Sequence, residues 1–382
     1  MKNFKLILKS LINNNACIEG GRTKPWYFAI IMLFVSMILC LVPSIVSSAT
    51  KSGDDFVKSS TNNYEVGVLR FVEELRKQDI SLTIKDVEGK KQMIATKGEL
   101  TGEAAWNAAF PNVNTQDVHC YTHYNADNKI DFQAFYFAEP INDTNWKKIS
   151  YDATYSVDDQ GNEVETLTAR TTSFLCLGLD TARGVVYTSA GSATSSSFYG
   201  DYKYFSDGYT INDLGTITID EHTYHGDEVI ALGEQAYADY RNKSWEDWKD
   251  FYRTGFLTYK FTSLWQTNLI LLGVNIGITF FMGLMLFILT RGKANPYRVY
   301  NFWDTQKMVY WGTPTVAVLA LVGGLIPFFS QFAQVIYPLL LGVRIMWMSM
   351  KSLNPQSGSP VYPKPNKEVK EVKAKNVKAK KA

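Results

Sequence analysis

The sequence has few of the residue types that most often carry chemistry. Only four cysteines and four histidines occur among its 382 residues. It contains no glycine-rich phosphate loop, no H-E-x-x-H helix and no G-x-S-x-G elbow. The apolar stretches contain few ionisable groups, whereas transporters and proton pathways usually place several at membrane depth. These absences favour a role that is not enzymatic, and they argue against transport by this chain alone.

The sequence does not decide whether its few cysteines form a disulfide or remain free thiols. Cys17 precedes the first apolar stretch and Cys40 lies within it, while Cys120 and Cys176 fall in predicted strands. A Cys120–Cys176 disulfide is allowed if both strands face an oxidising compartment. Two buried free thiols are equally compatible with the sequence.

The histidines form two close pairs. His119 and His123 are four residues apart in a predicted strand and therefore share a face, and His222 and His225 are three apart among acidic residues. Together the two pairs could hold zinc or copper. The alternation in the segment 117–124 instead favours a strand with one core face and one solvated face. The core face comprises Val118, Cys120, Thr122 and Tyr124, and the solvated face comprises Asp117, His119, Tyr121 and His123. We therefore expect no metal centre and no cofactor.

Long apolar stretches are the strongest positive signal. They cover residues 28–46, 269–289 and 309–348. A bilayer core about 30 Å thick is crossed by about 20 apolar helical residues, so the first two stretches fit one crossing each and the third fits two. The sequence predicts a membrane protein with an α-helical transmembrane bundle of about four spans plus an extracytoplasmic α+β domain.

Charge predicts the orientation in the membrane. The three segments at the cytoplasmic ends of these stretches are rich in lysine and arginine, whereas residues 51–266 contain 33 acidic and 20 basic side chains. Basic flanks stay in the cytoplasm. We therefore expect cytoplasmic N- and C-termini in the plasma membrane, an even number of crossings and an acidic domain on the outside.

The predicted organisation combines these two patterns. The first apolar stretch is interpreted as an uncleaved signal anchor, because its 19 residues exceed the 7–15 typical of a cleaved signal peptide. The segments are a cytoplasmic basic N-terminal segment (1–25), the first transmembrane helix (26–48), the extracytoplasmic domain with a juxtamembrane helix (49–264), the second transmembrane helix (265–290), a cytoplasmic loop (291–308), a transmembrane hairpin (309–350) and a cytoplasmic, lysine-rich, disordered tail (351–382).

Within the external domain the residue pattern changes twice. Helical spacing over 56–77 gives way to strand-like segments between 80 and 220, and helical character returns over 227–264. Among the strands, ISYDATYSV and ETLTARTTSFLCL flank the sequence DDQGN (158–162), which predicts a hairpin loop. In the last helical part we expect the aromatic residues at the headgroup level of the membrane, namely Trp245, Trp248, Phe251 and Tyr252.

Few polar residues interrupt the predicted spans. Arg344 lies about two helical turns from the cytoplasmic end, and we expect its side chain to snorkel to that surface. Asn275 lies among Gly273, Gly277 and Gly283, a pattern typical of a seam between two membrane helices.

The lysine-rich tail and the predicted spans indicate which classes of partner to expect. The tail contains nine lysines, and no aromatic residue that could stack on a base occurs after residue 363, so anionic lipid headgroups are better partners for it than nucleic acid. We expect contact with the lipid bilayer, a membrane-protein partner and no nucleic acid.

The opening segment FKLILKSLINNNACIEGGRTKPWYFAIIMLFVSMILCLVPS and the closing segment IPFFSQFAQVIYPLLLGVRIMWMSM resemble a family of bacterial membrane proteins. The family is uncharacterised, and some members are named maltodextrin-utilisation proteins from their gene neighbourhood with sugar ABC transporters. The resemblance implies a basic N-terminal segment, a first span, an external domain and a closing group of spans. It implies no functional residues.

Three functions remain open from the sequence. An accessory or scaffold protein that displays an external interaction domain, beside a sugar or solute transporter, fits best. The alternatives are an envelope sensor that binds a small external ligand and an envelope hydrolase that uses acidic residues not identified by any motif.

Overall fold

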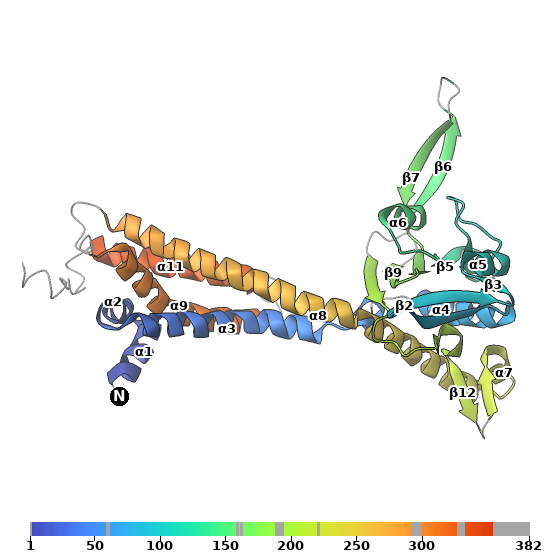
Figure 1. Cartoon of the computed structure of the whole chain (residues 1–382), viewed down its shortest axis with the longest axis horizontal. Coiled ribbons are helices and arrows are strands. Elements are labelled where there is room, and N and C mark those ends of the chain that lie inside the picture. The colour runs from blue at the N-terminus through green and yellow to red at the C-terminus, as the bar shows by residue number, and fades with distance from the viewer. Residues whose placement is uncertain are drawn as a thin grey trace, which may run out of the picture. The chain divides into compact units, whose positions relative to one another are not determined.

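The computed structural model of the chain describes most of its residues. The chain folds into two compact units, which we call the helical unit (1–50 with 263–382) and the β-rich unit (51–262) and describe separately (Figure 1). The predicted tail beyond residue 353, part of the predicted loop at 158–162 and residues 327–332 of the predicted transmembrane hairpin lie outside the described residues. The described residues are 2–58, 62–157, 160, 163–187, 195–219, 222–291, 300–326 and 333–353.

Apolar helices dominate the helical unit. Among the described residues, three helices are long and apolar enough to cross a membrane: α3 (Trp26–Thr50), α8 (Glu234–Leu289) and α9 (Phe302–Leu325). A further helix, α11 (Ala333–Leu353), contains the shorter apolar stretch Val335–Ser349. These helices and the β-rich unit confirm the coarse prediction of membrane-compatible helices beside a region rich in β-structure.

Helix α9 begins before the apolar stretch that predicted it. The side chain of Asn301 accepts a hydrogen bond from the Asp304 amide at 2.9 Å, and the Asp304 carboxylate accepts one from the Asn301 amide at 3.1 Å. This capping box starts the helix at Phe302, although the apolar stretch starts only at Val309. The first turns of α9 therefore carry polar residues.

Only one of the three glycines predicted to form a helix seam lies in one. A side chain at Gly283 would collide with the side-chain amide of Gln306 of α9, whose Nε2 donates to the Phe280 carbonyl of α8 at 3.0 Å. Gly273 and Gly277 have open space around them. A glycine favours helix association only where a second backbone comes near, and the sequence spacing alone does not show where that is.

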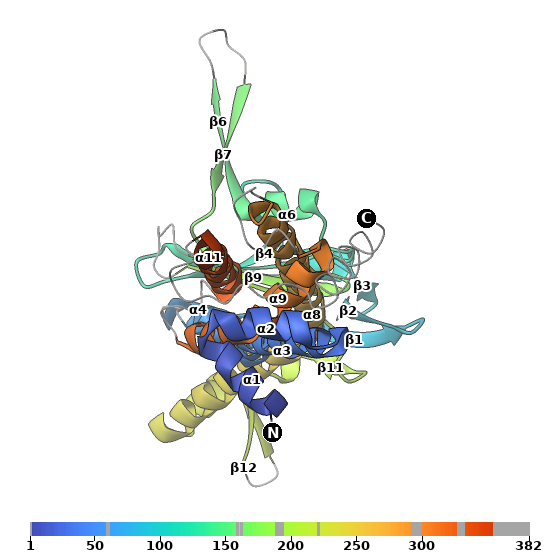
Figure 2. The same cartoon turned by 90° about the vertical axis from the view of Figure 1, so that its left-hand side faces the viewer.

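Two short helices precede the first apolar helix. They are α1 (Lys2–Ile12) and α2 (Asn14–Thr23), which the basic character of this segment did not predict. Side chains at Gly20 and Gly21 of α2 would collide with Trp311 and Met308, so α2 lies directly on α9. Figure 2 looks onto the end of the helical unit where α1 and α2 lie.

The prediction that Arg344 snorkels to the surface is wrong. Its guanidinium is buried, and Nη2 donates to the carbonyl of Ser10 and, at 3.2 Å, to Sγ of Cys17. The Thr315 hydroxyl donates to the neighbouring carbonyl of Leu11. The arginine is covered by the N-terminal helices, and the free carbonyls at the end of α1 attract its positive charge.

The β-rich unit contains two main sheets. The four-stranded sheet has the order β11-β1-β2-β3 and the five-stranded sheet the order β10-β9-β8-β5-β4. Two pairs stand apart, β6 with β7 and β12 with β13. The strands are β1 (Ser81–Val87), β2 (Lys90–Lys97), β3 (Leu100–Thr101), β4 (Cys120–Tyr124), β5 (Ile130–Tyr136), β6 (Tyr151–Val157), β7 (Glu163–Ala169), β8 (Ser173–Leu177), β9 (Thr181–Tyr187), β10 (Ser195–Asp201), β11 (Tyr209–Thr210), β12 (Thr216–Ile219) and β13 (His222–His225).

One connection in the five-stranded sheet is a crossover. Strands β5 and β8 are parallel, so the chain must return along the sheet between them. It does so through α6 (Asp143–Ser150) and then through the β6–β7 hairpin. The other helical segments of the unit are α4 (Asn62–Lys77), α5 (Glu103–Ala109), α7 (Gly226–Ile230), the 3₁₀ turns Gly53–Val57 and Ile211–Asp213, and the part of α8 up to residue 262.

The five-stranded sheet is buried on both faces. On one face Phe132 and Leu175 belong to the main core, against which α4 packs. On the other face Phe135 and Cys176 belong to a smaller core, to which α6 contributes Ile149. The apolar area buried on two faces makes this sheet the centre of the unit.

The alternation predicted for the segment 117–124 is half right. Cys120 is buried, as predicted for the apolar set. Tyr121 was predicted on the solvated face, but it is buried against Phe71 and Phe110. Because both faces of this sheet are covered, a strand within it does not need to alternate between apolar and polar side chains.

The aromatic residues of α8 have two different environments. Trp248, Phe251 and Tyr252 are buried in the main core of the β-rich unit, where the Tyr252 and Tyr64 hydroxyls are 2.8 Å apart. The prediction that they lie at the headgroup level is therefore wrong. In the helical unit, Trp265 on the same helix is 72% exposed.

Because of this difference, substitution by alanine should have a large effect on the stability of the β-rich unit at Trp248 and almost none at Trp265. Trp248→Ala should lower the free energy of unfolding of the β-rich unit by about 3–5 kcal/mol, since it empties a fully buried site. Trp265→Ala, the matched control, should leave that free energy unchanged within about 0.5 kcal/mol. Hydrogen exchange of the β-strand amides in the full chain measures both, and equal effects would contradict the assignment.

Candidate functional site

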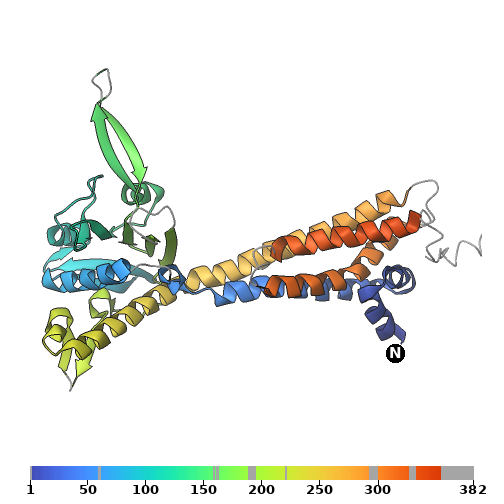
Figure 3. The ribbon, with the colours of Figure 1, turned by 180° about the vertical axis from the view of Figure 1, so that it is seen from behind.

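The β6–β7 hairpin of the β-rich unit has little packed against it. Its strands pair antiparallel over their whole length, from Tyr151 opposite Ala169 to Val157 opposite Glu163. Every residue of β7 is exposed, and so are most of β6. The green hairpin projects from the body of its unit in Figures 1 and 3. The strands confirm the hairpin predicted from the sequence.

The two faces of this hairpin differ in chemistry. Directly paired residues share a face, so one face combines Tyr151, Tyr155, Val157 and Leu167 with Glu163 and Glu165. On this face Tyr155 is 60% and Val157 69% exposed. The opposite face is mainly threonine and serine, with Thr154 paired to Thr166. We call the first one the apolar face of the hairpin.

A buried arginine holds the base of the hairpin. Arg170 follows β7 directly, and its Nη2 donates to Oδ1 of Asp152 in β6 at 2.9 Å. Nη1 donates to the side chain of Gln133 in β5. The guanidinium also lies 5.3 Å from the ring centre of Phe135. One side chain thus joins the hairpin to the central sheet.

The loop before β4 holds the other side of the base. The Thr115 hydroxyl accepts from the Ala153 amide at 3.0 Å, and Gln116 Nε2 donates to the Tyr151 carbonyl at 2.6 Å. Asn114 donates to the last turn of α6 at 2.8 Å. A two-stranded hairpin is at best marginally stable alone, so these contacts decide where the hairpin lies.

The cysteines do not form the disulfide that the sequence allowed. All four are free and buried. Cys120 in β4 and Cys176 in β8 both pair with Phe135, because β5 lies between their strands. Two strand spacings separate the cysteines by about 10 Å, beyond the roughly 7 Å limit for a bridge. Burial also raises the pKa of the Cys120 thiol, which keeps it protonated.

The histidines are not brought together. The ring of His119 bonds through Nδ1 to the carbonyl of Phe110 at 2.9 Å, and His123 lies opposite Phe132 in β5. His222 and His225 belong to β13, in a different sheet. Within the described part of the chain, no three His, Cys, Asp or Glu side chains lie close enough to share a metal ion.

His225 lines a shallow groove with charged neighbours. The groove is open to solvent and includes Glu73, Arg76 and Glu228. Partial burial lowers the pKa of His225 and nearby Arg76 lowers it further, while Glu228 opposes the shift. A neutral imidazole beside one arginine and two carboxylates forms no recognisable catalytic set.

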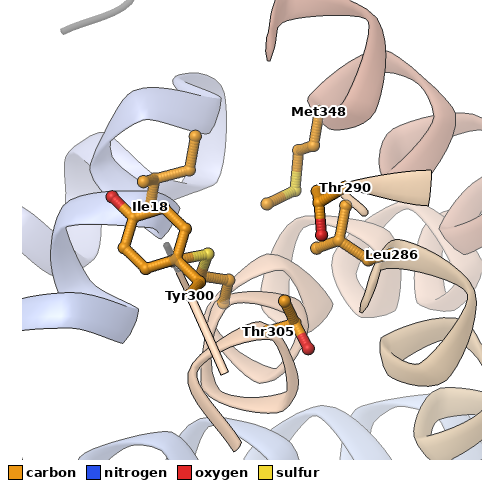
Figure 4. A pocket seen from close by; sticks show the side chains of 7 residues that line it. Ile18, Leu286, Thr290, Tyr300, Thr305 and Met348 are labelled. Carbon is orange, nitrogen blue, oxygen red and sulfur yellow. The ribbon is translucent and has the colours of Figure 1, made fainter. Parts of the chain in front are cut away.

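The helical unit contains a cavity between α2, α8, α9 and α11. Figure 4 shows Ile18, Leu286 and Met348 pointing into it, with Thr290 and Thr305 at its edge. Its volume of about 10 Å³ holds at most one water molecule. This cavity is too small for a solute.

Comparisons with protein-family models, with curated proteins and with solved structures found no match. The candidate site is therefore defined only by the structure of the hairpin and its base. Sequence reasoning identified the hairpin strands but missed the role of Arg170, because it placed that residue inside one continuous strand. A lone arginine between two threonine-rich segments was the only signal available.

The geometry of the hairpin base predicts a large effect of one substitution. Arg170→Ala should lower the free energy of unfolding of the β-rich unit by about 3 kcal/mol, because it leaves Gln133 and Asp152 without their partner; Asp152 is partly exposed, which reduces the loss. Arg241→Ala, which breaks a surface pair with Glu65, should cost under about 1 kcal/mol. Chemical denaturation of the full chain compares the two. Equal losses would show that Arg170 does not hold the hairpin.

Proposed function

We propose that this chain is a multi-pass membrane protein that displays its β-rich unit outside the cell and binds a partner protein through the apolar face of the β6–β7 hairpin. Its role is that of an accessory or scaffold component of a membrane complex. The resemblance to proteins encoded near sugar transporters leads us to place that complex beside a sugar or solute transporter.

The exposure of the apolar face is the observation that carries the binding role. Soluble surfaces rarely keep contiguous apolar side chains in water unless another molecule covers them. Tyr151 and Tyr155 are of the residue type enriched at the energetic centres of protein interfaces. The anchored base supports the proposal further, because a hairpin fixed in position loses less conformational entropy on binding.

Charge defines the partner more closely. Glu163 and Glu165 share the apolar face, and residues 51–266 carry an excess of acidic side chains. A second copy of the same surface would bring like charges together. The complementary surface is therefore apolar with arginine or lysine at its rim.

The proposed topology has four spans, α3, the apolar part of α8, α9 and α11, with both termini in the cytoplasm. The basic segments beside these helices support this orientation. Three exposed tryptophans near the ends of the apolar stretches support a position in a bilayer, where aromatic rings occupy the interfaces: Trp265, Trp303 and Trp347.

Labelling of single introduced cysteines tests the topology. A membrane-impermeant maleimide should label Thr166→Cys, an exposed position on the face opposite the apolar face, in intact cells. It should label Lys5→Cys only after the membrane is opened. The native thiols are all buried, so they should give a low background. Labelling of Lys5→Cys from outside, or protection of Thr166→Cys in intact cells, would overturn the orientation.

Crosslinking from the two faces of the hairpin tests the binding role. A photoreactive amino acid at Tyr155 or Leu167 should give one discrete protein adduct in the native cell, and one at Thr154 or Thr166 on the opposite face should give at least ten-fold less. The adduct should map to an apolar surface with basic neighbours. Equal yields from both faces, or adducts formed only with a second copy of this chain, would refute the proposed partner.

A further inference from the structure

Helix α1 has apolar side chains on two different faces. Leu6 is buried in the core of the helical unit. On the other side of the helix, Phe4 is 64%, Leu8 48% and Ile12 93% exposed. The spacing of four residues aligns these three side chains along one stripe. We call them the outer stripe of α1.

The outer stripe belongs to a helix that is fixed in place. Arg344 of α11 and Thr315 of α9 donate to the last carbonyls of α1, at Ser10 and Leu11. Sγ of Cys17 donates to the carbonyl of Trp311 at 3.4 Å, which ties the following helix to α9. Two helices that are distant from α1 in the sequence, α9 and α11, thus hold it against the rest of the helical unit. The exposed apolar residues of α1 are therefore held in a fixed position.

Two lysines lie beside the outer stripe. Lys5 and Lys9 are exposed and one turn apart, next in sequence to Phe4 and Leu8. An apolar stripe flanked by lysine is the pattern of a helix that lies in the membrane interface. The position of α1 supports this, since α2 leads through Lys24 and Pro25 directly into the apolar helix α3. A short, structured connection keeps α1 near the end of the spans.

We propose that α1 lies in the membrane interface and binds anionic phospholipid headgroups through Lys5 and Lys9, with its outer stripe at the boundary of the acyl chains. The charge of the two lysines favours a phospholipid surface of opposite sign over a neutral one. This site is separate from the lysine-rich C-terminal tail, and it requires only that the helical unit resides in a membrane.

Fluorescence of the full chain in lipid nanodiscs tests the proposal. Leu8→Cys is labelled with an environment-sensitive dye, in a chain truncated after Leu353 so that the tail makes no contribution. The discs contain phosphatidylcholine alone or with 30 mol% phosphatidylglycerol. We expect blue-shifted emission that is quenched by lipids with a spin label near the headgroup. Ile12→Cys provides a second labelled position in case the first perturbs packing.

Charge reversal tests the role of the lysines. In discs with phosphatidylglycerol, Lys5→Glu with Lys9→Glu should abolish the selective enrichment of that lipid around the protein, which we expect to be roughly five-fold for each lysine. Lys85→Glu with Lys90→Glu, exposed positions of the β-rich unit, makes the same change in net charge and should leave the enrichment intact. Native mass spectrometry of the bound lipids measures the ratio.

Three results would overturn the proposal. One is emission at the wavelength of a water-exposed dye in every disc, with full quenching by aqueous iodide. Another is an equal blue shift in protein held in a lipid-free amphiphilic polymer, which would mean that protein covers the stripe. The third is unchanged lipid enrichment after reversal of both lysines.

Discussion

The parallel pairing of β5 with β8 is the constraint on which the β-rich unit depends. A parallel pair cannot be closed by a tight turn, so the chain between the strands must cross over one face of the sheet. Helix α6 makes that crossing and covers the second core face. The hairpin β6–β7 is inserted in the same connection, where it extends beyond the core while both its ends stay tied to the centre of the fold.

The insertion explains why the hairpin can be both exposed and ordered. Its strands bury little apolar area, so their own packing contributes little. Arg170, which directly follows β7, compensates for this weak packing. It is hydrogen-bonded to Asp152 within the hairpin and to Gln133 within the sheet. A buried charge without partners is costly, and the arrangement that satisfies this one also sets the direction of the hairpin.

Sequence patterns predicted the local elements better than their surroundings. The alternating segments around DDQGN form the paired strands β6 and β7, and the apolar stretches form long helices. The same patterns misplaced Trp248, whose spacing on α8 is the same for a protein core as for a membrane interface. Tyr121 was predicted on the wrong face, because the hydroxyl group of a tyrosine does not reveal whether its ring is buried. These distinctions depend on which element packs alongside, and periodicity within one segment contains no such information.

The two buried arginines are a second case in which the sequence does not reveal the surroundings of a residue. Arg170 joins a hairpin to a sheet, and Arg344 joins the end of α1 to α11. Each donates from a planar guanidinium to acceptors in more than one segment, which the single ammonium of lysine cannot reproduce with the same geometry. In the sequence neither is distinguishable from a surface arginine. Each arginine holds the element that carries a proposed binding surface, so the order of both surfaces depends on a buried charge that does not itself belong to the contact.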